Sequence, residues 1–274
     1  MNYRGFSLSE LTLEYSPRAT VGGDFTHYLE AYAALSAAAH HQLSVRENLS
    51  YGKAPQQILD YFDGIGNNAP LHVFIHGGYW QALDQRVSSG MAPGIVEDGF
   101  AFATLNYTLA PQGRIGDMVD ECRSALDWLS QNTKELGFDP SQVILSGHSA
   151  GAHLVAMILS LYGNRFGNGN LCVTDAILIS GVYDLEPIAL VPVNDALQLT
   201  AQEIDELSPV FHQFPESVRV RVTAGEGDTS EFIRQSRDYA ERLRKDHRHV
   251  TFDLQRGRHH YDIIVRRETF QMKP

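Results

Sequence analysis

The sequence predicts an α/β protein with a mostly parallel central sheet and helices on both of its faces. Short apolar runs typical of buried strands alternate with amphipathic stretches of helical length along most of the chain. Neither a linker-like change of composition nor an internal repeat interrupts the 274 residues. We therefore expect a single domain that spans 1–274.

The elements are expected in a regular order. Residues 1–45 predict an N-terminal helical arm, because Phe25 and the side chains after it recur at helical spacing, and Asp24 is placed to cap that helix. Strands are expected at 46–51, 56–62, 71–75, 100–105, 142–145, 176–179, 218–222 and 250–254. Helices are expected at 86–98, 117–136, 150–162, 231–245 and 261–270. The irregular segment 185–207, interrupted by Pro187 and Pro192, predicts a small helical cap.

Composition excludes several classes of protein. The chain has 22 Lys and Arg against 33 Asp and Glu, a net charge of -11, and such a surface repels phosphate backbones and anionic lipid. We expect no nucleic acid and no membrane as partner. No segment resembles a signal peptide or approaches the roughly 20 apolar residues that span a bilayer, which favours a cytoplasmic protein. Cys122 and Cys172 are too few for a disulfide framework or a cysteine-based zinc site, and we expect no metal.

A candidate nucleophile lies between a predicted strand and a predicted helix. Residues 147–151 read Gly-His-Ser-Ala-Gly, which matches the pattern G-x-S-x-G. That chemistry needs a sharp strand-to-helix turn that exposes the oxygen of Ser149, and a Cβ at Gly147 or Gly151 would collide with neighbouring chain. A glycine-rich helix start with an ordinary capping serine is the alternative.

A second glycine-containing loop follows the strand expected at 71–75. Residues 76–80 read His-Gly-Gly-Tyr-Trp, and two glycines directly after a strand let backbone N–H groups approach a developing oxyanion. The same pair is also common in tight turns. The candidate oxyanion donors are the N–H groups of Gly77, Gly78, Tyr79 and Ala150. The rings of Tyr79 and Trp80 could form a substrate-binding wall or could pack in the core.

A serine nucleophile needs a histidine base and a carboxylate that orients it, on loops after later strands. Asp228 follows the strand expected at 218–222 and is preferred to Glu226 and Asp184 as the acid. Its alternative role is to cap the helix that follows. His259 and His260 both follow the last strand, and either is placed to be the base.

Taken together, these motifs resemble the α/β-hydrolases, and specifically the arylformamidase (kynurenine formamidase) family. Residues 76–80 resemble that family's HGGxW motif, and His260-Tyr-Asp-Ile-Ile264 resembles its H-F-D-I-I ending, which favours His260 as the base. Thr108 stands where the family usually has arginine, and Tyr261 replaces phenylalanine. Further similar segments are 15–18, 51–52, 106–107, 109–111, 147–153, 180–185 and 225–236.

The resemblance implies a serine hydrolase that converts N-formyl-L-kynurenine to L-kynurenine and formate, a step of tryptophan breakdown. Ser149 would be the nucleophile, His260 the base and Asp228 the orienting acid, with no cofactor and a small-molecule substrate. One alternative is a carboxylesterase or amidase for small aryl or short-acyl esters and amides. A second is a catalytically silent hydrolase fold used for binding. A homodimer is the assembly expected of this class.

Overall fold

The computed structural model describes residues 3–247 and 249–272. Within them a nine-stranded sheet has the order β1-β2-β4-β3-β5-β7-β8-β9, with the short β6 paired to β7. The strands are β1 Val45–Ser50, β2 Ile58–Phe62, β3 Ala69–Ile75, β4 Ala101–Leu105, β5 Phe138–His148, β6 Arg165–Phe166, β7 Leu171–Ile179, β8 Arg219–Gly225 and β9 Val250–Gln255.

The pairing of these strands confirms the predicted, mostly parallel α/β sheet. β1 and β2 form an antiparallel hairpin, and β2 pairs antiparallel with β4. From β4 to β9 each neighbouring pair along the sheet is parallel. The carboxyl ends of parallel strands meet at one edge, where α/β proteins bind their ligands. The loops after β3, β5, β7, β8 and β9 therefore converge at that edge.

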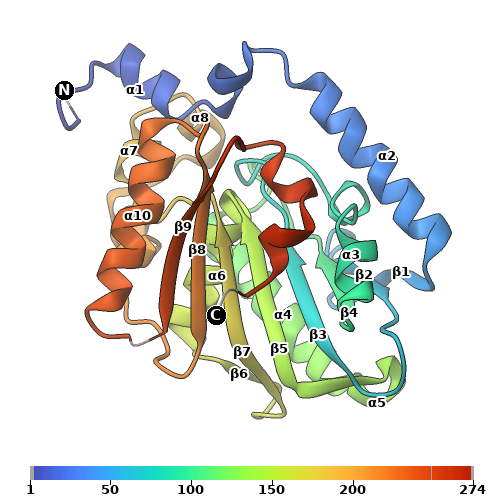
Figure 1. Ribbon diagram of the computed structural model, residues 1–274. Coiled ribbons are helices and arrows are strands. Elements are labelled where there is room, and N and C mark those ends of the chain that lie inside the picture. Colours follow the sequence, from blue (N-terminus) through green and yellow to red (C-terminus); the bar gives the residue numbers. More distant parts are fainter. Residues whose placement is uncertain (1–2, 248, 273–274) are drawn as a thin grey trace.

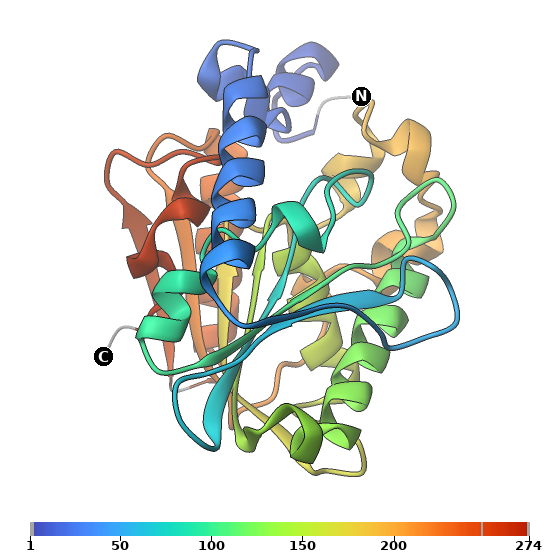
Figure 2. The same cartoon turned by 90° about the vertical axis from the view of Figure 1, so that its right-hand side faces the viewer.

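Helices cover both faces of the sheet, as Figures 1 and 2 show. Side chains of α4, α6 and α10 pack on one face, and those of α2 and α3 pack on the other. On β3, Val73 joins the first layer and its neighbour Phe74 joins the second, because successive strand residues point to opposite faces. The helices are α1 Leu8–Glu14, α2 Thr26–Gln42, α3 Ala92–Glu97, α4 Ile115–Gln131, α5 Thr133–Leu136, α6 Ala150–Tyr162, α7 Glu186–Ala189, α8 Asn194–Leu197, α9 Ala201–Glu206 and α10 Ser230–Arg244.

Two of the predicted helices were wrong, because the structure has 3₁₀ turns in these segments. The segment 86–98 contains a 3₁₀ turn, Gln85–Val87, and the separate helix α3, since Pro93 lacks an N–H and fits only the first turn of a helix. The segment 261–270 consists of two 3₁₀ turns, Ile263–Val265 and Arg267–Phe270. There the buried guanidinium of Arg221 on β8 donates to the backbone carbonyls of residues 268, 269 and 271, at 2.6 to 3.0 Å, and so holds this segment against the sheet.

The N-terminal arm lies across the carboxyl edge of the sheet before α2 descends beside α3 (Figure 1). It contains α1, which begins at a capping box between Ser7 and Glu10, a 3₁₀ turn, Pro17–Val21, and α2. Asp24 accepts a hydrogen bond at 3.0 Å from the N–H of Thr26, the first residue of α2. The residue directly before the helix is Phe25. The segment 185–207 holds the three short helices α7, α8 and α9.

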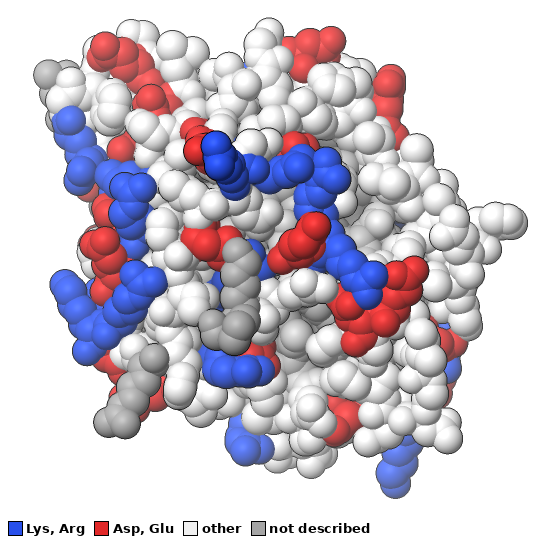
Figure 3. All heavy atoms as spheres, viewed as in Figure 1, with Lys and Arg blue, Asp and Glu red and all other residues white. Residues whose placement is uncertain are grey.

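The described helices include none that is both long and apolar enough to cross a bilayer. On the face seen in Figure 3, basic and acidic side chains are interspersed in small groups. A substrate approaching this face meets no single large field of one sign.

Candidate active site

Ser149 occupies a strained turn between β5 and α6. Its backbone has φ 55° and ψ -119°, a conformation that non-glycine residues rarely adopt. A Cβ on Gly147 would lie 2.3 Å from the carbonyl oxygen of Gly151, and one on Gly151 would lie 2.0 Å from the carbonyl oxygen of Ile75. Both glycines are therefore required by space, and the alternative of an ordinary capping serine does not describe this geometry.

Asp228 and His260 come from the loops after β8 and β9 and meet directly. The Nδ1 atom of His260 lies 3.2 Å from Oδ1 of Asp228, and both side chains are buried. The other carboxylate oxygen, Oδ2, accepts the Ser180 hydroxyl at 2.6 Å and the Gly225 N–H at 3.0 Å. The carboxylate is thus fixed from three directions. With Nδ1 turned to the acid, Nε2 is the histidine nitrogen left to accept a proton.

The competing residues have other partners. Glu226 accepts a backbone N–H of the neighbouring loop at 2.9 Å, and Asp184 accepts an arm tyrosine hydroxyl at 3.3 Å. His259 points its Nε2 to the hydroxyl of another arm tyrosine at 2.9 Å. Asp228 does not cap α10, because the residue before that helix is Thr229 and the Asp228 carboxylate is used as described above.

His148, which precedes the nucleophile, packs against His260 with ring centroids 4.6 Å apart. On the other side of His260 lies the ring of Phe232 from α10, at 4.7 Å. Burial lowers the pKa of His148 well below its usual value, and the neighbouring His260 lowers it further. His148 is therefore a neutral wall beside the base at neutral pH, and it does not compete for the proton.

The loop after β3 presses its backbone against the nucleophile. Gly78, Tyr79 and Trp80 follow one another with positive φ values of 97°, 53° and 58°. A Cβ on Gly77 would lie 3.1 Å from the Cβ of Ser149, so only glycine allows this approach.

This contact places Gly77, one of the four predicted oxyanion donors, beside Ser149. Among the described residues, the N–H groups of Gly77, Gly78 and Tyr79 donate to no acceptor. Ala150 is the first residue of α6, where a backbone N–H has no partner within its own helix. Unpartnered N–H groups next to a nucleophile are what an oxyanion hole requires.

The two aromatic residues of this loop differ in their surroundings. Trp80 is 0% exposed and packs edge-on against His153 at 5.0 Å, so its expected place in a substrate-binding wall is wrong and it belongs to the core. Tyr79 is only partly buried, and its hydroxyl donates to the carbonyl of Tyr15 at 2.5 Å. Tyr79 remains a candidate for the wall.

Sequence reasoning missed Ser180, whose hydroxyl holds the acid. The sequence could have indicated Ser180, because it directly follows the last residue of β7, at the same edge of the sheet as the other site residues. The described residues also include no group of three or more His, Cys, Asp or Glu side chains placed to hold a metal.

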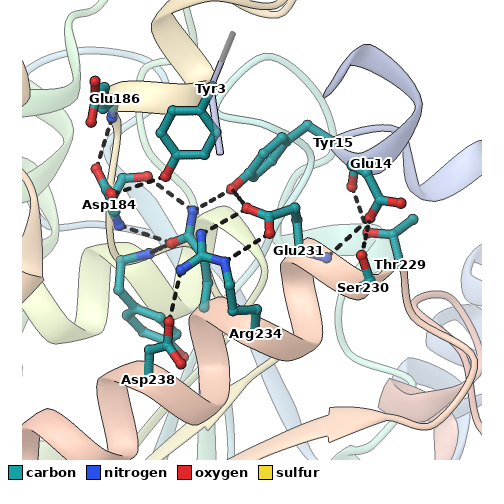
Figure 4. Close-up of polar contacts among 12 residues, drawn as sticks. Tyr3, Glu14, Tyr15, Asp184, Glu186, Thr229, Ser230, Glu231, Arg234 and Asp238 are labelled. Atoms are coloured by element: carbon teal, nitrogen blue, oxygen red, sulfur yellow. Dashed lines mark hydrogen bonds and ion pairs between the residues drawn. The ribbon is translucent and has the colours of Figure 1, made fainter. Parts of the chain in front are cut away.

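The N-terminal arm binds the loop and helix that follow Asp228 (Figure 4). Oε2 of Glu14 accepts the Ser230 hydroxyl at 2.8 Å and the Glu231 N–H at 3.1 Å, so the arm supplies the cap that α10 lacks in its own sequence. The Tyr15 hydroxyl donates to the buried carboxylate of Glu231 at 3.0 Å. Arg234 pairs with the same carboxylate at 2.7 Å.

The arm also contacts the loop that carries the base. The rings of Phe25 and Tyr28 stack on Tyr261, with centroids 5.5 and 5.4 Å apart, and the Tyr32 hydroxyl donates to the Tyr261 carbonyl. Together with the bond from Tyr79, these contacts connect the arm to the loops after β3, β8 and β9.

Comparisons with known proteins agree with this architecture. The sequence model of the BD-FAE family matches residues 62–243, which include Ser149 and Asp228. The kynurenine formamidase of Drosophila melanogaster is 35% identical over 80% of this chain and 75% of its own length. That of Danio rerio is 30% identical over 96% of this chain and 92% of its own length.

Solved structures show the same likeness. A putative thioesterase from Silicibacter sp. TM1040 superposes with a TM-score of 0.81 and 28% identity, covering 93% of each chain. The carboxylesterase EstE1, from a metagenomic library, has a TM-score of 0.72 at 17% identity and shares the fold. With the parallel sheet, the strained serine turn and these relatives in place, the chain belongs to the arylformamidase (kynurenine formamidase) family of α/β-hydrolases and is a hydrolase.

Proposed function

We propose that this enzyme hydrolyses the formamide of N-formyl-L-kynurenine to L-kynurenine and formate with a triad of Ser149, His260 and Asp228. The observation that carries the proposal is the buried His260–Asp228 pair, which comes from the strand ends that converge on the Ser149 turn. The relatives named kynurenine formamidases support the choice of substrate.

The first step forms a tetrahedral intermediate on Ser149, which becomes a formyl-enzyme when the C–N bond breaks. The Ser149 oxygen attacks the formyl carbon while Nε2 of His260 takes the hydroxyl proton, and Asp228 stabilises the resulting imidazolium. Negative charge develops on the formyl oxygen. The N–H groups of the loop after β3 and of Ala150 would bind that oxyanion, and each such donor is typically worth about 10²–10³ in kcat.

The second step releases both products. The C–N bond breaks as His260 returns its proton to the departing arylamine, which leaves as L-kynurenine and frees space for water. Water then attacks the formyl ester, His260 takes one of its protons, and the C–O bond to Ser149 breaks. The proton passes to the Ser149 oxygen, formate leaves, and the enzyme returns to its starting state.

Ester hydrolysis by the same groups is the second candidate. It is favoured by the likeness to the putative thioesterase, which at 28% identity covers nearly the whole chain. An ester and a formamide need the same nucleophile, base and oxyanion donors, so the two activities differ in how the acyl and leaving groups fit.

The test compares substrates and one variant. We expect the wild type to cleave N-formyl-L-kynurenine with a higher kcat/KM than phenyl acetate or phenyl butyrate. In Ser149→Ala, kcat should fall by about 10⁴-fold and labelling by a fluorophosphonate should disappear. Ser141→Ala is the matched control, because Ser141 is exposed on the same strand, away from the turn, and should retain both properties.

Two outcomes would contradict the proposal. Equal or faster cleavage of the esters would favour a carboxylesterase. A wild-type chain that is folded but neither labelled nor active would favour a silent fold used for binding.

A further inference from the structure

The N-terminal arm carries an arginine without an acidic partner. Arg18, in the 3₁₀ turn Pro17–Val21, is exposed, and its guanidinium carbon lies 4.2 Å from the ring centroid of Phe25. Within residues 3–247 and 249–272, no carboxylate pairs with it. Ten other arginines each pair with an Asp or Glu, whereas Arg18 and six further described arginines do not, so what distinguishes Arg18 is its stacking on Phe25 and its place on the arm.

The arm contacts the rest of the protein both before and after Arg18 in the chain. Three residues earlier, the Tyr15 carbonyl accepts the hydroxyl of Tyr79 from the loop of oxyanion donors. On the other side, the Phe25 ring on which Arg18 stacks lies against Tyr261, whose own ring is 5.9 Å from that of His260. Arg18 therefore lies between the arm's contacts with the oxyanion loop and its contacts with the base loop.

The nearby acidic groups, two on the arm and one on α10, have other partners. Asp24 accepts the Thr26 N–H at 3.0 Å. The Glu14 carboxylate caps α10, and the Glu231 carboxylate is held by Tyr15 and Arg234. The Tyr261 hydroxyl faces Arg18. Burial raises the pKa of Tyr261 to about 12, while Arg18 acts in the opposite direction, so the phenol stays neutral. A hydrogen bond from Arg18 to the Tyr261 hydroxyl uses part of the guanidinium, and its other N–H donors have no acidic partner among the described residues.

We propose that Arg18 binds the carboxylate of the substrate, so that the arm selects aryl amides whose side chain carries a carboxylate. The inference rests on the proposed function for the identity of the substrate, whose amino-acid side chain stands ortho to the formamide and ends in a carboxylate. A guanidinium matches a carboxylate with two parallel hydrogen bonds, and stacking on Phe25 orders it before binding. A net charge of -11 gives no long-range attraction to an anion, so such a contact must be local.

The experiment pairs a substrate that carries a carboxylate with one that does not. In Arg18→Met, which keeps the apolar stem, kcat/KM for N-formyl-L-kynurenine should fall about 10-fold or more through KM. Cleavage of formanilide, which lacks the carboxylate, should stay unchanged, and Arg18→Lys should restore part of the loss. Arg4→Met is the matched control, an exposed arginine at the start of the same arm that should behave as the wild type.

The remaining outcomes separate this inference from the proposed function. An equal loss on both substrates would make Arg18 a structural residue, and no loss on either would remove it from the site; both overturn the proposal. If the wild type does not cleave formylkynurenine, the pair becomes 4-acetoxybenzoate and phenyl acetate. A loss confined to the carboxylate-bearing ester would support Arg18, and an equal response would overturn it. A chain that cleaves none of the four substrates contradicts both proposals.

Discussion

Around Ser149 the chain is held by backbone packed against backbone, whereas around Arg18 it is held by side-chain hydrogen bonds and stacked rings. Gly151 leaves no space even for a methyl group beside Ile75, while the arm contacts its partners through Glu14, Tyr15 and Tyr28. The serine turn thus belongs to the rigid sheet, and the arm is a further layer that packs over it. The difference predicts that substitutions in the serine turn lower the stability of the fold, whereas substitutions in the arm change mainly how the substrate binds.

The largest effect is expected at the serine turn. In Gly151→Ala the new Cβ would lie 2.0 Å from a backbone oxygen, which cannot move without shifting β3. We expect a loss of about 3 kcal/mol or more in the free energy of unfolding, measured in urea. Gly116→Ala is the control, because the nearest atom to its Cβ is 4.0 Å away, and in α4 it should stabilise by about 0.5–1 kcal/mol. Similar results for both variants would refute the contrast.

Acid should weaken the region beneath the turn. Burial lowers the pKa of His72, on β3, to about 3 and that of His153, on α6, to about 4. In the unfolded chain both titrate near 6.5, so below that pH the unfolded state binds protons that the native state does not. Stability is therefore complete above about pH 6.5 and falls on acidification, by up to about 1.4 kcal/mol per pH unit for each histidine.

Urea unfolding between pH 8 and 5 measures this dependence. The slope should decrease in His72→Gln and remain in His249→Gln, since His249 is exposed. A wild-type stability independent of pH below 6.5 would contradict the prediction.

The smallest effect is expected in the arm. Glu14→Ala removes the acceptor at the start of α10 and should cost about 1 kcal/mol, with faster hydrogen exchange at the first turn of that helix. Glu30→Ala, exposed on α2, should change neither quantity. Unaltered exchange in Glu14→Ala would mean that the arm does not hold this helix.

The sequence predicted the features that depend on local pattern. Gly147 and Gly151 define the serine turn, and the apolar runs define the parallel strands. Other features depend on contacts between distant residues. Arg221 on β8 binds the carbonyls of the last segment, Trp80 packs against His153 in the core, and the choice of His260 over His259 needed the family resemblance. The cytoplasmic location and the homodimer stay predictions.

One consequence of the arm concerns the order of synthesis. Glu14 bonds with residues 216 and 217 positions later in the chain, and Tyr28 with one 231 positions later. Along this sequence the arm is therefore synthesised well before these partners. A nascent chain that stops before α10 can already place Tyr15 against the loop after β3, yet it lacks the helix that Glu14 caps and the loop that carries Tyr261. The contacts of the arm are completed only after translation has passed β9.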